Sequence, residues 1–301
     1  MSRFFFVLSI GLLFLLSSCL KEVSQPIEPS VLKKFQLIPA DPVNVIYLNL
    51  KNLKKSKYWK DFLVNDIEIQ NRTRKTILDS IGIDFEKDID EIIIATEWNG
   101  YNTFIITLNK PAKDLRLQTE FKDYGIYTDD KILFISNELN RVEKVKNDGV
   151  ENNFTKNPLF RRIINSIQYK NHFWFVTRNT SLFLNLLKDG SQNDEKIGKL
   201  FRSINFINFS LKLEKDVSIN SHWECTDEYK ANLLRGVLNG IISAIILTEP
   251  DDPFVKELSR TDIFLENNGV DLQLKISREK INELRKSSIA NKLKRITEYE
   301  R

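Results

Sequence analysis

Short apolar segments recur along the chain between clusters of turn residues. Segments rich in β-branched and aromatic residues predict strands. In the first half, the predicted strands are residues 44–50, 91–98, 101–108 and 125–136, the last being a strand pair or one bulged strand around Asp129-Asp130. Asn99-Gly100 separates two of these segments, which predicts a tight β-hairpin.

Helical segments separate these strands. Residues 53–81 have helical spacing, and a polar segment from Pro111 to residue 121 predicts a short helix. The element order is therefore β-α-β-β-α-β. The same order returns downstream, with strands at 173–176, 204–213, 217–225, 261–265 and 270–276 and helices at 179–187, 228–247 and 278–298.

This repeated order predicts an α+β fold of two tandem ferredoxin-like units, each an antiparallel sheet with helices on one face. The first unit is residues 36–146 and the second is residues 147–301, which begins with a helical connector at 157–167. Alternation in 217–225 places His222 and Glu224 on one face of a strand. Cys225 lies on the other face, with Trp223, and is expected to face the core.

The first residues have the layout of a bacterial lipoprotein signal. Arg3 precedes an apolar run over 4–16, followed by Ser17, Ser18 and Cys19. The run is shorter than the roughly 20 residues of a spanning helix. Residues 16–19 resemble the lipobox, which implies cleavage after residue 18 and acylation of Cys19. An ordinary secretory signal with an incidental cysteine, or a buried apolar strand, would be the alternatives.

Lipidation of Cys19 would attach the mature chain to a membrane, because each acyl chain buries many methylenes. Residues 19–35, with Pro26 and Pro29, are expected to form a flexible tether. Many Gram-negative lipoproteins that stay at the inner membrane have Asp after the cysteine. This chain has Leu20 there, so the resemblance favours the outer membrane, on its periplasmic or surface face, if the cell is Gram-negative.

Composition is that of an ordinary folded protein, with 42% hydrophobic and 29% charged residues. A formal charge of +4 with interspersed signs does not indicate a nucleic-acid partner. With Cys19 acylated, Cys225 has no partner for an intramolecular disulfide. The two histidines leave little room for a zinc site. No cofactor or metal is expected, although a carboxylate-only metal site stays open.

Cys225 and the two histidines are candidate site residues. Cys225 and His222 would form a nucleophile and base only if they shared a face, so a buried structural thiol is preferred. His222 and Glu224 could form an acid-base pair, but a solvated sheet face is the preferred interpretation. His172, at the start of a strand, is interpreted as an edge histidine.

Clusters of like charge have similar structural interpretations. The acidic cluster is interpreted as a helix-to-strand turn rather than a calcium-binding loop. Ile89 and Ala95 stand at the positions where such a loop needs Gly and Glu. It comprises Asp84, Glu86, Asp88, Asp90 and Glu91. The basic stretch fits a solvated helix face better than contact with anionic headgroups. It comprises Lys51, Lys54, Lys55, Lys57 and Lys60. The amphipathic last helix is expected to pack on the second sheet.

Three segments carry a resemblance to a known family. Residues 38–41 (IPAD), 45–50 (VIYLNL) and 82–91 (GIDFEKDIDE) are similar to the recurring pattern of an uncharacterised family of exported bacterial proteins, many of them lipoproteins. The family commonly has Pro where this chain has Phe85. The second half matches only in element order and in the Cys-Thr-Asp-Glu start of a helix. The resemblance implies export but no activity.

Together these observations favour a membrane-tethered envelope protein that binds or scaffolds an envelope partner without catalysis. An envelope enzyme with a carboxylate or His222-Glu224 site, and a carrier of a lipid or other apolar ligand, are the alternatives. The sequence leaves the oligomeric state open.

Overall fold

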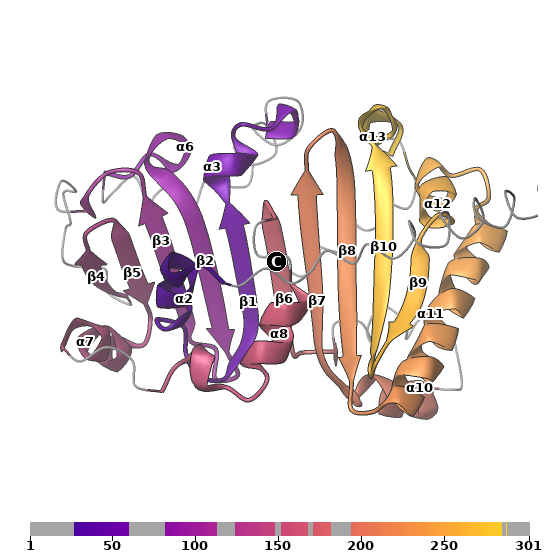
Figure 1. Cartoon of the computed structure of the whole chain (residues 1–301), viewed down its shortest axis with the longest axis horizontal. Helices are drawn as coiled ribbons and strands as arrows, with labels where there is room; N and C mark the ends of the chain where they lie inside the picture. The colour runs from indigo at the N-terminus through magenta and orange to yellow at the C-terminus, as the bar shows by residue number, and fades with distance from the viewer. Residues whose placement is uncertain are drawn as a thin grey trace, which may run out of the picture.

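The structure is a computed structural model that describes residues 27–59, 82–112, 124–147, 152–167, 171–181, 194–284 and 287. It is an α+β fold built on one sheet of ten strands (Figure 1). The strands are β1 (Pro42–Asn49), β2 (Ile89–Glu97), β3 (Asn102–Leu108), β4 (Gly125–Asp129), β5 (Ile132–Ser136), β6 (Phe173–Thr177), β7 (Ile204–Leu213), β8 (Asp216–Cys225), β9 (Asp262–Glu266) and β10 (Gly269–Ser277).

Short helices connect the strands and cover parts of both faces. They are α2 (Pro29–Phe35), α3 (Leu50–Leu53), α6 (Phe85–Asp88), α7 (Leu139–Asn147), the 3-10 turn η3 (Phe154–Lys156), α8 (Phe160–Ser166), α10 (Asp194–Phe201), α11 (Glu228–Thr248), α12 (Pro253–Leu258) and α13 (Arg278–Leu284). Most of the helices predicted at 53–81, 111–121 and 179–187, and the part of the last predicted helix (278–298) beyond residue 284 except Ser287, lie outside the described residues.

The strand order in the sheet is β4-β5-β3-β2-β1-β6-β7-β8-β10-β9. Every described neighbouring pair is antiparallel. The halves join where β1 pairs with β6, with Ile46 opposite Phe175. This single sheet does not confirm two tandem ferredoxin-like units, because such units need parallel pairing across a βαβ crossover. Element order alone does not determine which strands pair.

The central position of β1 and β6 follows from their composition. Val45 and Tyr47 of β1 point to one face, and Ile46 and Leu48 point to the other. A strand that is apolar on both sides is stable where both faces are covered. The runs NVIYLNL (44–50) and FWFV (173–176) therefore have the pattern expected of central strands.

The two faces are named by their residues. The first face carries Tyr47, Trp174 and His222, and the second face carries Ile46, Phe175 and Cys225. Helices α2, α7 and α8 pack on the first face, since their buried residues share a core cluster with Tyr47 and Trp174. Helices α10 and α11 pack on the second face with Cys225. The expectation of helices on one face only is therefore wrong, because both faces of this sheet carry apolar rows that need cover.

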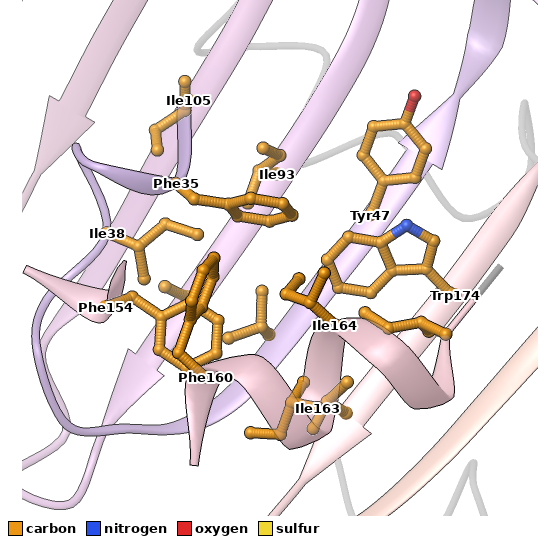
Figure 2. Close-up of a cluster of buried hydrophobic side chains, with 14 of the residues drawn as sticks. Phe35, Ile38, Tyr47, Ile93, Ile105, Phe154, Phe160, Ile163, Ile164 and Trp174 are labelled. Carbon is orange, nitrogen blue, oxygen red and sulfur yellow. The ribbon is translucent and has the colours of Figure 1, made fainter. Parts of the chain in front are cut away.

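An aromatic core joins the two halves on the first face (Figure 2). Tyr47 of β1 stacks on Trp174 of β6, with ring centroids 5.2 Å apart. Phe35 of α2 lies 5.8 Å from Trp174 and 5.8 Å from Phe160 of α8. Trp174 is 1% exposed. Burial of side chains from both halves in one cluster makes the sheet a single packed body.

Residues 29–35 differ from the predicted flexible tether. Pro29 starts α2, and Phe35 at its end is fully buried. Proline is favoured at the first turn of a helix, where its missing N–H costs nothing. The tether prediction treated Pro29 as a breaker rather than as a helix start. Residues 19–26 lie outside the described residues.

The predicted hairpin turn at Asn99-Gly100 is confirmed, and a second tight turn joins β9 to β10. β2 and β3 flank the turn at Asn99-Gly100, where Gly100 has φ 86°. β9 and β10 flank Asn267-Asn268, and Asn267 has φ 54°. Glycine and asparagine tolerate this left-handed region better than other residues. The segment 125–136 is a strand pair, β4 and β5, with its turn at Asp130.

Candidate functional site

His222 is the centre of a polar cluster on the first face. It lies on β8 opposite Asn208 of β7 and Asp271 of β10, and Glu224 is two residues further on β8. Arg162 reaches the cluster from α8. Three neighbouring strands and one helix thus bring together charged groups that are far apart in the sequence.

Hydrogen bonds fix the His222 imidazole at both nitrogens. Nδ1 lies 2.9 Å from Asp271 Oδ1, and Nε2 lies 3.1 Å from Glu224 Oε2. The other Glu224 oxygen is 2.8 Å from the Arg162 guanidinium. The Asn208 side chain accepts a hydrogen bond from the His222 backbone N–H at 3.1 Å. The His222 and Glu224 side chains are 12% and 8% exposed, so the prediction of a solvated sheet face is wrong here.

The cluster balances two positive groups with two negative ones. Burial lowers the pKa of His222, but hydrogen bonds to Asp271 and Glu224 outweigh burial and raise it to about 9. Burial raises the pKa of Glu224, but the His222 hydrogen bond and the Arg162 charge outweigh burial and lower it below its usual range. Buried charges persist when they are paired and hydrogen-bonded in this way.

This arrangement determines what His222 can do chemically. Each ring nitrogen faces a carboxylate oxygen, so both must carry a proton and donate. An imidazolium with both N–H groups donating has no lone pair to act as a general base. The cluster therefore holds β8, β10 and α8 together, and we assign it a structural role.

Gly269 completes the cluster by letting the imidazole lie against the backbone. A Cβ at position 269 would overlap the His222 ring, coming 2.8 Å from Nε2. Asn268, next to it, donates to Glu224 Oε1 at 3.3 Å. The turn between β9 and β10 thus contributes space as well as a donor.

Cys225 lies on the opposite face from His222, as the alternation predicted. It is a free cysteine, fully buried in the cluster with α10 and α11. Burial raises the pKa of its thiol to about 12. A thiol that stays protonated and out of contact with solvent is not a nucleophile, so a buried structural thiol fits its surroundings.

His172 and the acidic cluster both have local structural roles. His172 Nδ1 accepts from the Leu213 backbone N–H at 3.1 Å, and burial lowers its pKa. Asp84 caps α6 by accepting from the N–H groups of Glu86 and Lys87. Helix α6 leads directly into β2, so the predicted helix-to-strand turn is confirmed.

The basic stretch is partly engaged within the protein. Lys54 donates to the Ile89 carbonyl at 2.7 Å, and Lys51 lies 3.7 Å from Asp90. Lys55 and Lys57 follow α3, and Lys60 lies outside the described residues. The stretch therefore does not present a continuous row of free lysines.

The sequence did not indicate a second buried polar group on the first face. Lys34 of α2 pairs with Glu91 of β2, and the side chains are 10% and 20% exposed. Burial and the neighbouring Glu91 raise the pKa of Tyr47, whose hydroxyl accepts from Asn49 at 3.2 Å. The sequence feature that could have indicated this group is Glu91, an acidic residue near the start of an otherwise apolar strand and on the same face as Tyr47.

The described residues show a surface depression but no metal-binding group. Within the described ranges, no group of three or more His, Cys, Asp or Glu side chains could hold a metal ion. A surface depression lies at Glu228, Tyr229, Asn232 and Leu265, where α11 meets β9. That depression includes no member of the His222 cluster.

Helix α11 has the length and apolar composition of a membrane span. Of the part of the chain that the structure describes, it is the one helix that does, with hydropathy 1.5 and 17% of the stretch buried. It buries Ala231, Leu234 and Leu238 against the sheet. A helix packed on a sheet can have the same composition, so length and composition are weak evidence for a span.

A row of apolar side chains crosses the second face and is only half-buried. Pairing places Ile94, Ile46, Phe175 and Phe209 side by side on β2, β1, β6 and β7. Phe104 and Leu272 extend the row at its two ends. None of these six is among the fully buried residues. This row, termed the central row, lies between the two second-face clusters, against which its end residues Phe104 and Leu272 pack.

No family model matches the chain, and no curated protein matches it. Three crystal forms of the protein TP0453 resemble the structure. Form I shares 9% identity, covering 86% of this chain and 97% of that one, with a TM-score of 0.48. Form III shares 8%, covering 86% and 98%, with 0.45, and form IV shares 7%, covering 85% and 95%, with 0.49. Likeness at this level carries no argument about function.

Proposed function

We propose that the mature protein is a membrane-tethered cell-envelope lipoprotein that binds or scaffolds a partner without catalysis. The Cys19 pattern supports the tether, and the export implied by the family resemblance agrees with it. Leu20 favours the outer membrane if the cell is Gram-negative. Partner binding is the role that a tethered α+β protein with an extended sheet surface can serve.

The arrangement at His222 is the observation that carries the non-enzymatic part of the proposal. Its two nitrogens face Asp271 and Glu224, so the strongest acid-base candidate in the sequence is used in pairing. The buried Cys225 thiol faces the other side of the sheet. Because His222 is ion-paired and Cys225 is buried, no observation on the described residues favours the alternative of an enzyme that uses the His222-Glu224 pair.

The tether is tested by mass spectrometry of the mature N-terminus and by fractionation of Cys19→Ser. We expect the N-terminus to be an acylated Cys19, and the variant to lose lipid and membrane association. Cys225→Ser is the matched control and should remain lipidated and membrane-bound. An unmodified N-terminus, or a Cys19→Ser chain that stays membrane-bound, would contradict the tether.

Partner binding is tested by crosslinking in intact envelopes followed by copurification. We expect the lipidated chain to retain one or more envelope proteins that the Cys19→Ser chain does not. Absence of any partner or ligand after crosslinking would count against the binding role while leaving the tether intact.

The central row supports a second candidate function, carriage of a lipid or other apolar ligand. A half-buried row of large apolar side chains is the kind of surface on which such a ligand could lie. Mass spectrometry of ligand extracted from the purified protein tests it. A protein purified without any apolar ligand would contradict this second function.

We also infer that the two halves arose from one duplicated unit. Counted outward from the join, the first half runs β1, β2, β3, β5, β4 and the second runs β6, β7, β8, β10, β9. In each half, the first three strands therefore lie side by side in sequence order. The fifth strand then pairs with the third, and the fourth strand lies at the edge. This matching order supports two five-stranded units rather than the four-stranded ferredoxin-like units predicted.

A further inference from the structure

Helix α11 lies at one end of the molecule, beyond the edge strand β9 (Figure 1). Its buried side chains Ala231, Leu234 and Leu238 belong to the cluster on the second face of the sheet. The opposite side of the helix is exposed, although its composition is as apolar as that of a membrane span. Packing on the sheet therefore accounts for only one side of α11.

The exposed side of α11 carries a heptad pattern. Six positions follow one another at alternating spacings of four and three residues, and all six are exposed and uncharged. They are Tyr229, Leu233, Gly236, Gly240, Ser243 and Leu247, termed the α11 seam. This spacing places them in one narrow stripe along the helix. A stripe of this kind is the pattern by which one helix packs lengthwise against another.

Two glycines occupy the middle of the α11 seam. Nothing lies within 4 Å of a Cβ at Gly236 or at Gly240, so the packing of α11 on its own chain does not require glycine there. Glycine weakens a helix interior relative to alanine, and its benefit is that another backbone can approach closely. The centre of the seam is therefore suited to a second helix at short range.

The two ends of the α11 seam carry a projection and a hollow. Leu247, near the C-terminal end of the helix, is 82% exposed. The surface depression lies at the other end, where Tyr229 and Asn232 line it together with Leu265 of β9. Tyr229 and Leu247 are about 27 Å apart along the helix axis. A helix running in the opposite direction would therefore bring a projecting leucine to each depression.

A second copy of α11 in antiparallel orientation matches the α11 seam along its length. When Gly236 of one copy lies opposite Gly240 of the other, Leu247 lies opposite Tyr229. In the same register Leu233 lies opposite the small Ser243. One two-fold axis between the helices produces every one of these contacts twice, which is the symmetry of most protein dimers.

From the exposed heptad pattern, the two open glycines and the matching of Leu247 to the depression, we infer that α11 pairs antiparallel with α11 of a second copy of this chain. A bilayer would contact a broader side of the helix, whereas Asn232 and Asn239 lie beside the seam and are exposed. One helix pair is small compared with the interface of a stable dimer, so the pair should dissociate on dilution. The inference does not depend on the proposed function.

Analytical ultracentrifugation of the mature chain with Cys19→Ser tests the pairing. We expect a dimer at about 100 μM protein and a monomer at about 1 μM, because the equilibrium follows mass action. Leu247→Asp should raise the dissociation constant at least tenfold, since it places a charge against the partner helix. Leu139→Asp is the matched control. Leu139 lies on α7 and is 58% exposed, so this variant should dimerise like its parent.

Gly236→Gln with Gly240→Gln separates the loss of pairing from the loss of folding. Glutamine is a better helix former than glycine, and nothing lies within 4 Å of a Cβ at either position. The variant should therefore keep the circular dichroism spectrum of its parent. It should be a monomer at about 100 μM, because the longer side chains hold the two backbones apart.

Disulfide crosslinking tests the antiparallel orientation. Asn239 lies beside its own counterpart near the two-fold axis, so Asn239→Cys should form covalent dimers under mild oxidation. Position 247 lies about 27 Å from its counterpart along the axis, so Leu247→Cys should crosslink only when it is mixed with Tyr229→Cys. The native Cys225 is buried and should not react.

Three results would overturn the inference. A monomer at every concentration would show that the α11 seam does not pair, and flotation of that monomer with phosphatidylcholine vesicles would assign the seam to a bilayer. A dimer that persists in both seam variants would place the interface elsewhere. Crosslinking of Leu247→Cys to itself would show that the helices pair in parallel.

Discussion

At the residue scale, the His222 charge is tied to the folded state. Its pKa of about 9 exceeds the usual 6.5 because Asp271 and Glu224 stabilise the imidazolium. In the unfolded chain the same group titrates near its usual value. The pairing therefore contributes stability that is present in full below pH 6.5 and is lost as pH rises through about 9.

We predict that replacing His222 by Gln removes this pH dependence. The native chain should lose about 1–3 kcal/mol of unfolding free energy from this group over that range. The variant should be less stable at neutral pH and show a flatter profile. Chemical denaturation across the range measures both curves. Parallel curves for the two proteins would show that the imidazole is not held as a cation.

The close approach of Gly269 to His222 leads to a second prediction. Gly269→Ala should destabilise the protein by about 1–3 kcal/mol, because its methyl group overlaps the imidazole ring. Gly236→Ala, on α11, is the control. Nothing lies within 4 Å of a Cβ there, so alanine should raise stability by about 0.5–1 kcal/mol through helix propensity. Equal effects in thermal or denaturant unfolding would contradict the predicted overlap.

The residue scale also shows what alternation can predict. The face of Cys225, and the shared face of His222 and Glu224, followed from a period of two along β8. The burial of His222 did not follow, because it requires Asp271 from β10 and Arg162 from α8. Asp271 pairs with His222 and Arg162 pairs with Glu224. Both partners lie far away in the sequence, where no local pattern indicates them.

At the element scale, α11 is a helix whose two sides have different environments. Asp227 caps it by accepting from the Lys230 N–H. Leu234 faces the sheet and is fully buried, whereas its neighbour Leu233 is 41% exposed. Leu234 is therefore expected to contribute more to the free energy of unfolding than Leu233.

We predict that Leu234→Ala costs about 2–5 kcal/mol of unfolding free energy, because it leaves a cavity under the helix. Leu233→Ala is the matched control and should cost less than about 1 kcal/mol, since little buried surface is lost. Denaturant unfolding measures both. Similar losses for the two variants would contradict the packing of α11 on β8 and β10.

Element types were predictable where the local signal was strong. The hairpin turn at Asn99-Gly100 followed from turn chemistry, and the long helix that begins at Glu228 was predicted over residues 228–247. Helix α2 did not, because Pro29 was weighed as a breaker. Its stability depends on Phe35 packing against Phe160, a contact across more than a hundred residues.

At the scale of the whole molecule, the join between β1 and β6 makes one body from two halves. Tyr47 and Phe35 come from the first half, and Trp174 and Phe160 come from the second, yet all four share one core. The stacking of Tyr47 on Trp174 stabilises the contact between the halves by about 0.5–1.5 kcal/mol beyond the burial of the two rings.

We predict that the described body unfolds in one transition, because its halves share this core. Far-ultraviolet circular dichroism and tryptophan fluorescence should give the same midpoint in denaturant. Trp174→Leu should lower that midpoint for both probes together. Two separate transitions would show that the halves fold independently, as the prediction of two separate units implied.

The sequence by itself determined the properties that depend on neighbours along the chain. These are the signal-like N-terminus with Cys19, the strands and their hairpins, and the faces of β8. The tertiary structure alone decided that β1 pairs with β6, that one sheet spans both halves, and that Arg162, His222 and Asp271 meet. Strand pairing and charge pairing are long-range contacts, and their free energy depends on burial by distant segments, which no local pattern records.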